Sequence, residues 1–218
     1  MLLSFGRNWD GRREGAGRPR IGRRKGVAHR ARDEHKARHP MHVTLRAGRW
    51  VTSLRQQVVF FEIRRALRRA SRSWFRVIHF SVQRDHVHLL VEAHDKVAVA
   101  RGIAGLAVRI ARRVNALVGR RGKFWGDRYH GRELRTPQEV RRALVYVVMN
   151  WAKHNARARG FDPCSSAFWL EGWKVPPGQG PRTWDEEDAP VRRPRTWLAR
   201  EGWRVHGLIG RDERPSLA

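Results

Sequence analysis

Residues 84–92 read RDHVHLLVE and place two histidines, His86 and His88, one residue apart inside an apolar run. Side chains alternate between the two faces of an extended strand, so both imidazoles would point the same way. The preceding run, residues 75–83, has the composition of a second strand, and only a short polar turn separates the two. The pattern predicts an antiparallel β-hairpin that carries the histidine pair on one face.

Outward from this hairpin, strand-like and helix-like segments alternate. A β-rich run over residues 42–47 precedes a helical segment at 54–73, and a second helical segment at 97–118 follows the hairpin. An extended segment at 124–134 and a helix at 137–155 come next. This order predicts an α+β fold, namely a ferredoxin-like antiparallel sheet with helices packed on it. Such a layout serves many functions, so function has to come from particular residues.

Apolar periodicity predicts which side of the first two helices packs on the sheet. Thr52 or Ser53 is expected to cap the first of them. The residues expected in the core are Leu54, Val58, Phe61, Ile63 and Leu67 from the first helix, and Val99, Ile103, Leu106, Ile110, Val114 and Leu117 from the second.

The last of these helices has a well-marked start. Residues 136–139 (TPQE) form a capping box with proline at the first helical position. Farther along, Tyr146 and Asn150 are four residues apart and share a helix face. A tyrosine followed one turn later by an amide could hold a phenol nucleophile beside a metal ligand. For the helix taken alone, the alternative is an ordinary half-buried tyrosine and a surface asparagine.

The histidine pair also admits two interpretations. Two imidazoles on one face supply half of a metal site, whereas the simpler alternative is a strand with two satisfied polar side chains. A phenol attacks phosphorus poorly unless the phosphate is polarised. A divalent ion held by His86, His88 and an amide oxygen would polarise it. Together these residues suggest metal-assisted attack of a tyrosine on a phosphodiester.

Composition indicates the kind of partner. The chain has 218 residues and a net charge of +27, which favours a polyanion, with nucleic acid as the first candidate. A membrane surface is the competing polyanion, but the basic residues are spread along the chain. No apolar run approaches the roughly 20 residues of a membrane span. No signal-peptide core is recognisable and Cys164 is the only cysteine, which favours a cytoplasmic protein.

Both ends of the chain differ from its middle and predict three parts. Residues 1–40 are expected to form a basic flexible arm, with eleven Arg or Lys between positions 11 and 40. The arm would contact DNA, with a passive solubilising tail as the alternative. Residues 41–155 would form the catalytic domain, and residues 156–218 an irregular extension rich in Trp, Arg and Pro.

The extension carries tryptophans close to arginines, and a short final helix is expected at 196–207. Trp184, Trp197 and Trp203 would either stack on exposed bases or fasten the extension to the core. The sequence leaves both options open.

Three stretches give the central region a family resemblance. They read QRDHVHLL at 83–90, FWGDRY at 124–129 and RRALVYVVMN at 141–150. In this order and spacing, over residues 41–155, they resemble the single-tyrosine HUH transposases, in particular the branch of REP-associated tyrosine transposases. The chain departs from many members of that branch at Trp151, where they carry proline.

The resemblance implies a metal-dependent endonuclease and strand transferase that acts on single-stranded DNA in transposition and DNA recombination. Tyr146 would be the nucleophile and form a 5′-phosphotyrosine link. His86 and His88 would hold Mg²⁺ or Mn²⁺, with Asn150 as the third ligand. The substrate would be a hairpin-forming DNA end, bound by a monomer or a homodimer. The residues expected to contact DNA are Arg23, Arg24, Lys25, Arg112, Arg113, Arg128 and Tyr129.

Two alternatives stay open at this point. Tyr129, the other of the two tyrosines, is the rival nucleophile, but it lies on a predicted strand with no amide one turn away. In the resemblance it belongs to the aromatic segment. The second alternative is a non-catalytic DNA- or RNA-binding protein on the same fold, which would not need the set His86, His88 and Tyr146.

Overall fold

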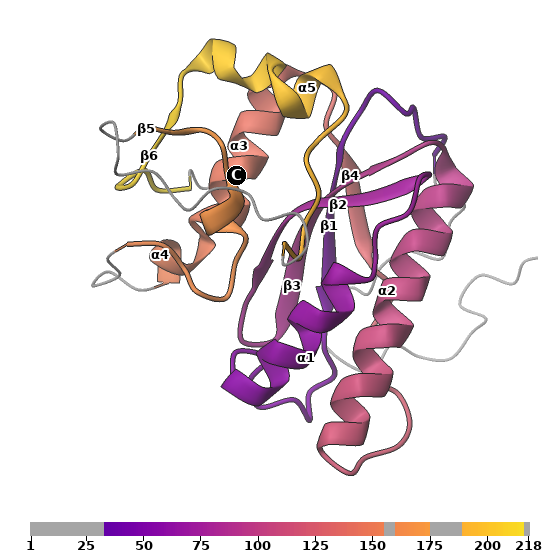
Figure 1. Cartoon of the computed structure of the whole chain (residues 1–218). Helices are drawn as coiled ribbons and strands as arrows, with labels where there is room; N and C mark the ends of the chain where they lie inside the picture. Colours follow the sequence, from indigo (N-terminus) through magenta and orange to yellow (C-terminus); the bar gives the residue numbers. More distant parts are fainter. Residues whose placement is uncertain (1–32, 155–159, 175–188, 216–218) are drawn as a thin grey trace, which may run out of the picture.

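The structure, a computed structural model, describes residues 33–154, 160–174 and 189–215. At its centre is an antiparallel sheet of four strands in the order β2-β3-β1-β4 (Figure 1). The strands are β1 (Met41–Arg46), β2 (Phe75–Val82), β3 (His86–Ala93) and β4 (His130–Glu133). Strand β3, which carries the histidine pair, therefore pairs with β2 on one side and β1 on the other, and both pairings fix its register.

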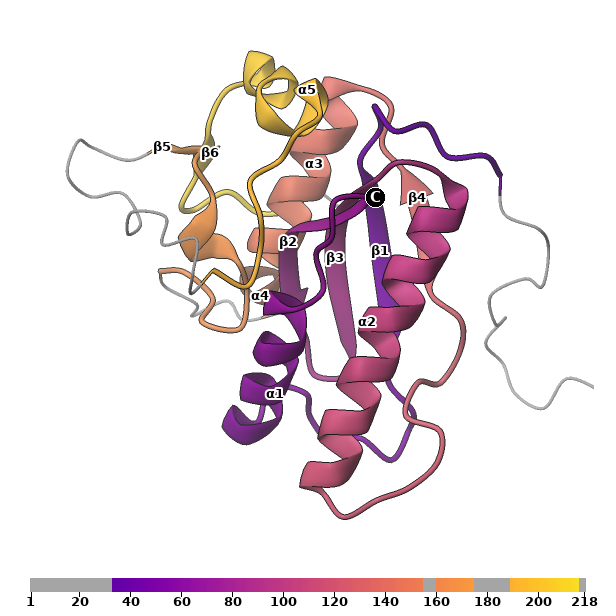
Figure 2. The same cartoon turned by 45° about the vertical axis from the view of Figure 1, so that its right-hand side comes forward.

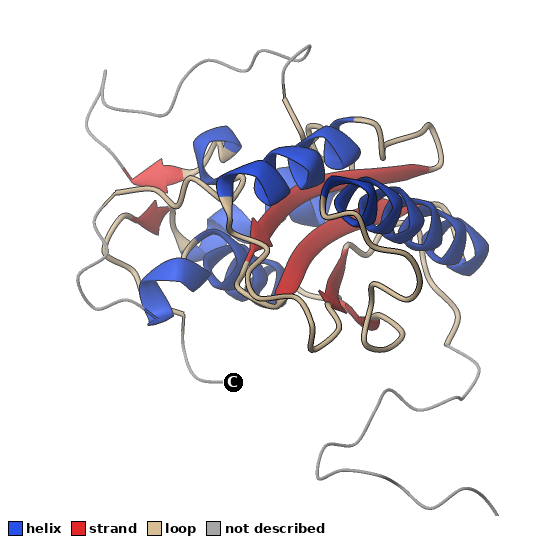
Figure 3. Ribbon diagram, turned by 90° about the horizontal axis from the view of Figure 1, so that it is seen from below, coloured by secondary structure: helices blue, strands red, loops and turns tan. Residues whose placement is uncertain are grey.

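Three helices form the layers on the sheet (Figures 2 and 3). They are α1 (Gln57–Arg68), α2 (Lys96–Leu117) and α3 (Pro137–Val148). Two apolar clusters distinguish the faces: Leu89 of β3 packs in the cluster of α1 and α2, whereas Leu90 packs in the cluster of α3. The order βαββαβ with this strand order confirms the predicted ferredoxin-like α+β fold, with α3 added on the other face.

The predicted hairpin is confirmed, since β2 and β3 pair antiparallel. His88 lies opposite Thr44 of β1 and Ser81 of β2. Alternate residues of a strand share a face, so both histidines of β3 lie on the same side as Leu90. The pair therefore faces α3, while the opposite face of β3 is buried under α1 and α2.

The predicted core side of the first helical segment is confirmed for Leu54, Ile63 and Leu67, which are buried, and is wrong for Val58 and Phe61. The helix begins at Gln57 rather than 54, and no side chain, neither Thr52 nor Ser53, forms its N-terminal cap. Val58 and Phe61, which were expected in the core, are 59% and 56% exposed. Residues 58–61 read VVFF, so two helix phases fit the apolar pattern equally well. The buried residues of the helix are Val59, Ile63, Ala66 and Leu67.

The second helix follows its prediction more closely. Asp95 caps α2, because its side chain accepts a hydrogen bond of 2.7 Å from the backbone N–H of Ala98. Leu117, at the C-terminal end, was expected in the core but is 45% exposed. The other predicted core residues, Val99, Ile103, Leu106, Ile110 and Val114, are buried.

Two segments that were predicted as longer elements are shorter in the structure. The extended segment at 124–134 is a strand only in β4, although Trp125 forms an isolated bridge with Ala47. The capping box of α3 is present as predicted, but the helix ends at Val148 rather than near 155. A separate short helix, α4 (Asn150–His154), follows. Tyr146 and Asn150 therefore lie in two successive helices.

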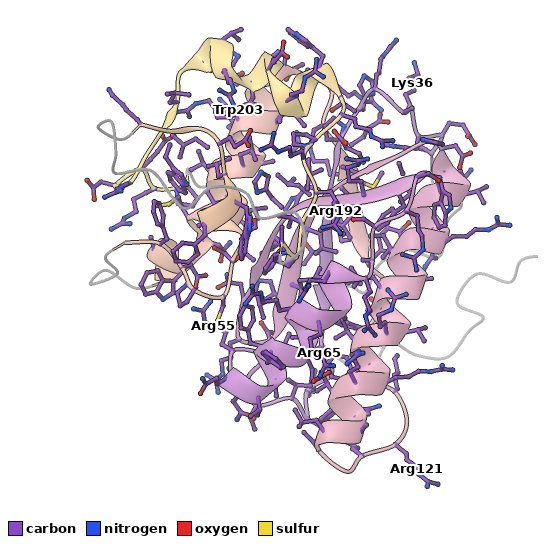
Figure 4. The ribbon with its side chains drawn as sticks, in the orientation of Figure 1. Lys36, Arg55, Arg65, Arg121, Arg192 and Trp203 are labelled. Carbon is purple, nitrogen blue, oxygen red and sulfur yellow. The ribbon has the colours of Figure 1, made fainter. Side chains whose placement is uncertain are left out.

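The extension packs against the site-bearing elements where it is described. It contains the 3-10 helix η1 (Ala167–Trp169), α5 (Trp197–Arg200), the 3-10 helix η2 (Gly202–His206), and the parallel pair β5 (Trp173–Lys174) and β6 (Ile209–Gly210). Trp203 is buried beside α3, which favours fastening for this tryptophan (Figure 4). Trp197 is 55% exposed, and Trp184 lies outside the described residues. The short final helix expected at 196–207 is present as α5 followed by η2.

Polar contacts fasten the extension as well. Glu92 of β3 is buried, and its carboxylate accepts hydrogen bonds from the backbone N–H groups of Arg195 and Thr196. On α3, the guanidinium of Arg141 donates to both carboxylate oxygens of Glu213, at 2.7 and 3.0 Å. The extension thus holds both the histidine strand and the tyrosine helix. No helix in the described ranges is long and apolar enough to cross a membrane.

Candidate active site

The sheet face under α3 brings the predicted nucleophile to the histidine pair. The rings of His86 and His88 lie with their centroids 4.6 Å apart. The ring of Tyr146, from α3, lies 5.0 Å from that of His88. It also lies 5.6 Å from the ring of His42, a β1 residue that the sequence did not single out. Three elements distant in sequence therefore meet in one aromatic cluster.

A carboxylate orients the first histidine. Nδ1 of His86 lies 2.6 Å from a carboxylate oxygen of Asp85, and Arg46 donates to the other oxygen of Asp85 at 2.7 Å. Burial acts to raise the pKa of Asp85, but the hydrogen bonds with His86 and Arg46 outweigh it and lower this pKa. The carboxylate stays charged and holds the ring through Nδ1, which leaves Nε2 as the nitrogen available to a ligand.

The second histidine is held in the same way by uncharged partners. Nδ1 of His88 lies 3.1 Å from the hydroxyl oxygen of Thr44 and 3.2 Å from Nε2 of His42. Burial, reinforced by the positive charges of His130 and Arg132, lowers the pKa of His42 to about 4. His42 is consequently neutral at pH 7. Contacts at Nδ1 again assign Nε2 of His88 to any ligand.

The rival tyrosine lies elsewhere. Tyr129 is partly buried against the apolar cluster of α1 and α2, whereas Tyr146 packs against the cluster of α3. His130 lies opposite Thr44 and therefore faces the same side of the sheet as His88. Tyr129 is the residue next to His130, so its side chain faces the other side. The sheet thus separates Tyr129 from the histidine pair, and Tyr146 is the tyrosine on the side of His88.

Asn150 is fully buried, so the alternative of a surface asparagine is wrong. Neither polar atom of its amide has a hydrogen-bond partner among the described residues. An unpartnered buried amide costs about 1–3 kcal/mol, which suits a group whose partner is a ligand. Imidazole nitrogen and amide oxygen are donor types that suit a divalent ion whose shell is completed by phosphate and water. Among the described residues, no group of three or more His, Cys, Asp or Glu side chains is arranged to hold a metal.

Of the residues predicted to contact DNA, the structure describes Arg112, Arg113, Arg128 and Tyr129. Those outside the described residues are Arg23, Arg24 and Lys25. Arg112 is exposed on α2, and Arg113, on the same helix, donates to Glu62 of α1 at 2.6 Å. Both belong to the helix layer on the other face of the sheet, where Arg65 of α1 also lies, and Arg121 lies in the loop that follows α2 (Figure 4). Arg128 is exposed before β4.

Sequence reasoning missed the contribution of β1 and β4 to this face. Register places Thr44 opposite His88, and Arg132 of β4 opposite His42. The alternation of His42 and Thr44 with buried Val43 on β1 was a visible signal. It could be used only once the pairing of β1 with β3 was known.

Residues 39–147, half of the chain, match the family model described as "Transposase IS200 like". The chain belongs to the IS200-like transposase family. In this transposase the matched span contains β1, the histidine pair and Tyr146, and ends before Asn150. No curated protein matches the chain.

One solved structure similar to this transposase is that of a REP-associated tyrosine transposase bound to a REP hairpin. The two chains are 17% identical, and their TM-score is 0.49. The similarity covers 64% of this chain and 82% of the other.

Proposed function

We propose that this transposase is a metal-dependent single-strand DNA endonuclease and strand transferase of the single-tyrosine HUH kind, in the REP-associated branch. The observation that carries the proposal is the contact between the rings of Tyr146 and His88, 5.0 Å apart, on the sheet face that His86 shares. A non-catalytic binding protein would need neither the histidine pair nor a tyrosine held against His88.

The reaction is a transesterification at phosphorus. The phenol oxygen of Tyr146 attacks a backbone phosphate, and the bond between phosphorus and the 3′ oxygen breaks. The phenol proton ends on the departing 3′ oxygen, which becomes a free hydroxyl. A 5′-phosphotyrosine link remains, and it keeps the energy of the phosphodiester. Attack by another 3′-hydroxyl on this link reverses the chemistry and joins the strands.

In this proposal His86 and His88 hold a divalent ion through Nε2, with the amide oxygen of Asn150 as a further ligand. When bound, Mg²⁺ or Mn²⁺ polarises the phosphate as a Lewis acid. The protein keeps the two rings in place through Asp85 and Thr44, which contact the Nδ1 atoms. Such outer contacts fix tautomer and orientation and usually matter for affinity by 10–100-fold.

DNA binding in the proposal rests on the charge of the whole chain. A net charge of +27 supplies affinity for phosphates without sequence preference. Residues 1–32 act as the arm on the DNA backbone, whereas residues 33–40, the rest of the predicted arm, pack on the sheet, where His35 and His39 are buried against Glu133. Residues 41–155 carry catalysis, and Arg112, Arg113, Arg128 and Tyr129 add contacts outside the histidine cluster. The substrate is a single strand that forms a hairpin.

The experiment is a covalent capture assay. A pool of hairpin-forming oligonucleotides with randomised single-stranded flanks is labelled at the 3′ end, incubated with the protein and Mn²⁺, and resolved under denaturing conditions. Labelled protein is expected with Mn²⁺ and not with EDTA. Binding of the same pool without any covalent product, in the presence of metal, would instead support the non-catalytic alternative.

A further inference from the structure

His42 is the residue of the aromatic cluster to which the proposed chemistry assigns no part. It sits on β1, and its Nε2 lies 3.2 Å from Nδ1 of His88. The two rings are tilted by 34° with centroids 5.2 Å apart. The ring of His42 also meets that of Tyr146 edge to face. One side chain therefore contacts both the proposed ligand and the proposed nucleophile.

We infer that His42 is a positioning residue, which fixes the tautomer of His88 and the orientation of its ring relative to Tyr146. The inference rests on the proposed function, because it assigns Nε2 of His88 to the metal. His42 does not itself qualify as a ligand beside His88. The Nε2 atom of His42 faces Nδ1 of His88, whereas the metal would bind His88 through its Nε2 atom.

The tautomer follows from hydrogen-bond chemistry. Between the two ring nitrogens, one has to donate and the other to accept. If Nε2 of His88 carries a lone pair for the metal, its proton lies on Nδ1, and Nδ1 donates. The acceptors within reach are the lone pair of Nε2 of His42 and the hydroxyl of Thr44. His42 thus prepares His88 for the metal before any metal arrives.

The backbone supports this arrangement. His42 and Thr44 alternate on β1, and pairing of β1 with β3 sets Thr44 opposite His88 and His42 opposite Leu90. Both acceptors are therefore fixed by the sheet rather than by a loop. A side chain on a paired interior strand can hold a ring to the small tolerance that metal ligation requires.

The test measures Mn²⁺ affinity of the DNA-free full-length protein by electron paramagnetic resonance. His42→Phe keeps an aromatic ring but removes the acceptor, and it is expected to weaken Mn²⁺ binding about 10–100-fold. His42→Gln places an amide oxygen near the position of Nε2 and is expected to restore most of the affinity. His94→Phe, at an exposed histidine just after β3, is the matched control and should bind like the unaltered protein. Thermal unfolding confirms that each variant is folded.

Two outcomes would overturn the inference: Mn²⁺ affinity unchanged in His42→Phe, or affinity lost equally in the Phe and Gln variants. A second measurement needs no variant at all. Nitrogen-15 NMR of the metal-free protein should find the His88 proton on Nδ1, and a proton on Nε2 would contradict the inference. Should the unaltered protein bind no Mn²⁺ and form no covalent product, the proposed function fails. Should it do both while His42→Phe behaves identically, only the role of His42 fails.

Discussion

Tyr146 of α3 and His88 of β3 face each other nearly at right angles, with ring planes 82° apart and centroids separated by 5.0 Å. The contact joins the helix with the best-marked start to the strand with the most distinctive motif. α3 lies on the sheet face opposite α1 and α2, so Tyr146 can meet His88 only if the histidines point away from those two helices. The site therefore depends both on the sheet face that the histidines of β3 occupy and on the sheet face that α3 covers.

Metal dependence is the first expectation. His86→Ala combined with His88→Ala removes both proposed imidazole ligands, and covalent capture of the hairpin pool should fall to background. DNA binding should persist, because phosphate contacts supply most of the affinity. Gel-shift and capture assays on the same samples separate the two effects. His94→Ala serves as control, and a folded double variant that no longer binds DNA would reassign the pair to recognition.

Replacing Asn150 should raise the stability of the metal-free protein and lower its affinity for the metal. Asn150→Leu replaces a buried, unpartnered amide by an apolar group of similar size. The metal-free protein should gain about 1 kcal/mol in free energy of unfolding, whereas Mn²⁺ affinity and capture should drop. Asn115→Leu is the contrasting variant, since Asn115 donates to the carbonyl of Gly122 at 2.9 Å and should lose stability. A stabilised Asn150→Leu protein with full metal affinity would remove Asn150 from the ligand set.

The basic arm should contribute through salt-dependent binding. Positions 11–32 hold nine Arg or Lys, and each phosphate contact on a single strand adds about 0.7 to the slope of log affinity against log salt. Protein lacking residues 1–32 should bind the hairpin pool more weakly and with a shallower slope. Full-length protein with Arg23, Arg24 and Lys25 changed to Gln should fall between. Equal slopes for all three proteins would make the arm a passive tail.

A buried histidine outside the site should make stability depend on pH. His79 of β2 is 6% exposed, contacts the hydroxyl of Ser166 at 3.0 Å, and burial lowers its pKa to about 4. The unfolded chain binds this proton near pH 6.5, so stability is full above that value and is lost as pH falls towards 4.

Between pH 6.5 and 5 the loss due to His79 should be about 2 kcal/mol, from roughly 1.4 kcal/mol per pH unit. His79→Gln should flatten the dependence of the free energy of unfolding on pH in this window, as measured by urea titration. Exposed His94→Gln should leave it unchanged. A dependence that is the same in both variants would show that other groups cause it.

Local patterns predicted much of the fold correctly. The hairpin of β2 and β3 and the capping box of α3 were predictable because alternation and cap chemistry act over a few residues. The exposure of Val58 and Phe61 on α1 was not predictable, because VVFF at 58–61 fits two faces of a helix equally well. The end of α3 at Val148 also lacks a local signal, since no glycine or proline interrupts the pattern there.

Within the site, the sequence identified the residues whose signal is local. The histidine pair and Tyr146 were expected to meet, and the structure brings His88 and Tyr146 together. His42 could not be found in this way, because its position beside His88 depends on strand register between segments 46 residues apart. The ligand and nucleophile roles, and the division into arm, catalytic domain and extension, stay predictions.

The nucleophile is tested most directly by locating the covalent bond. Protein trapped on the 3′-labelled hairpin pool is digested, and the DNA-bearing peptide is sequenced by mass spectrometry. We predict that the nucleotide is attached to Tyr146, and that Tyr146→Phe abolishes the adduct while Tyr129→Phe keeps it. The two changes each remove one phenol oxygen and keep the ring, so packing is matched. A nucleotide attached to Tyr129, or an adduct that survives in Tyr146→Phe, would contradict the account.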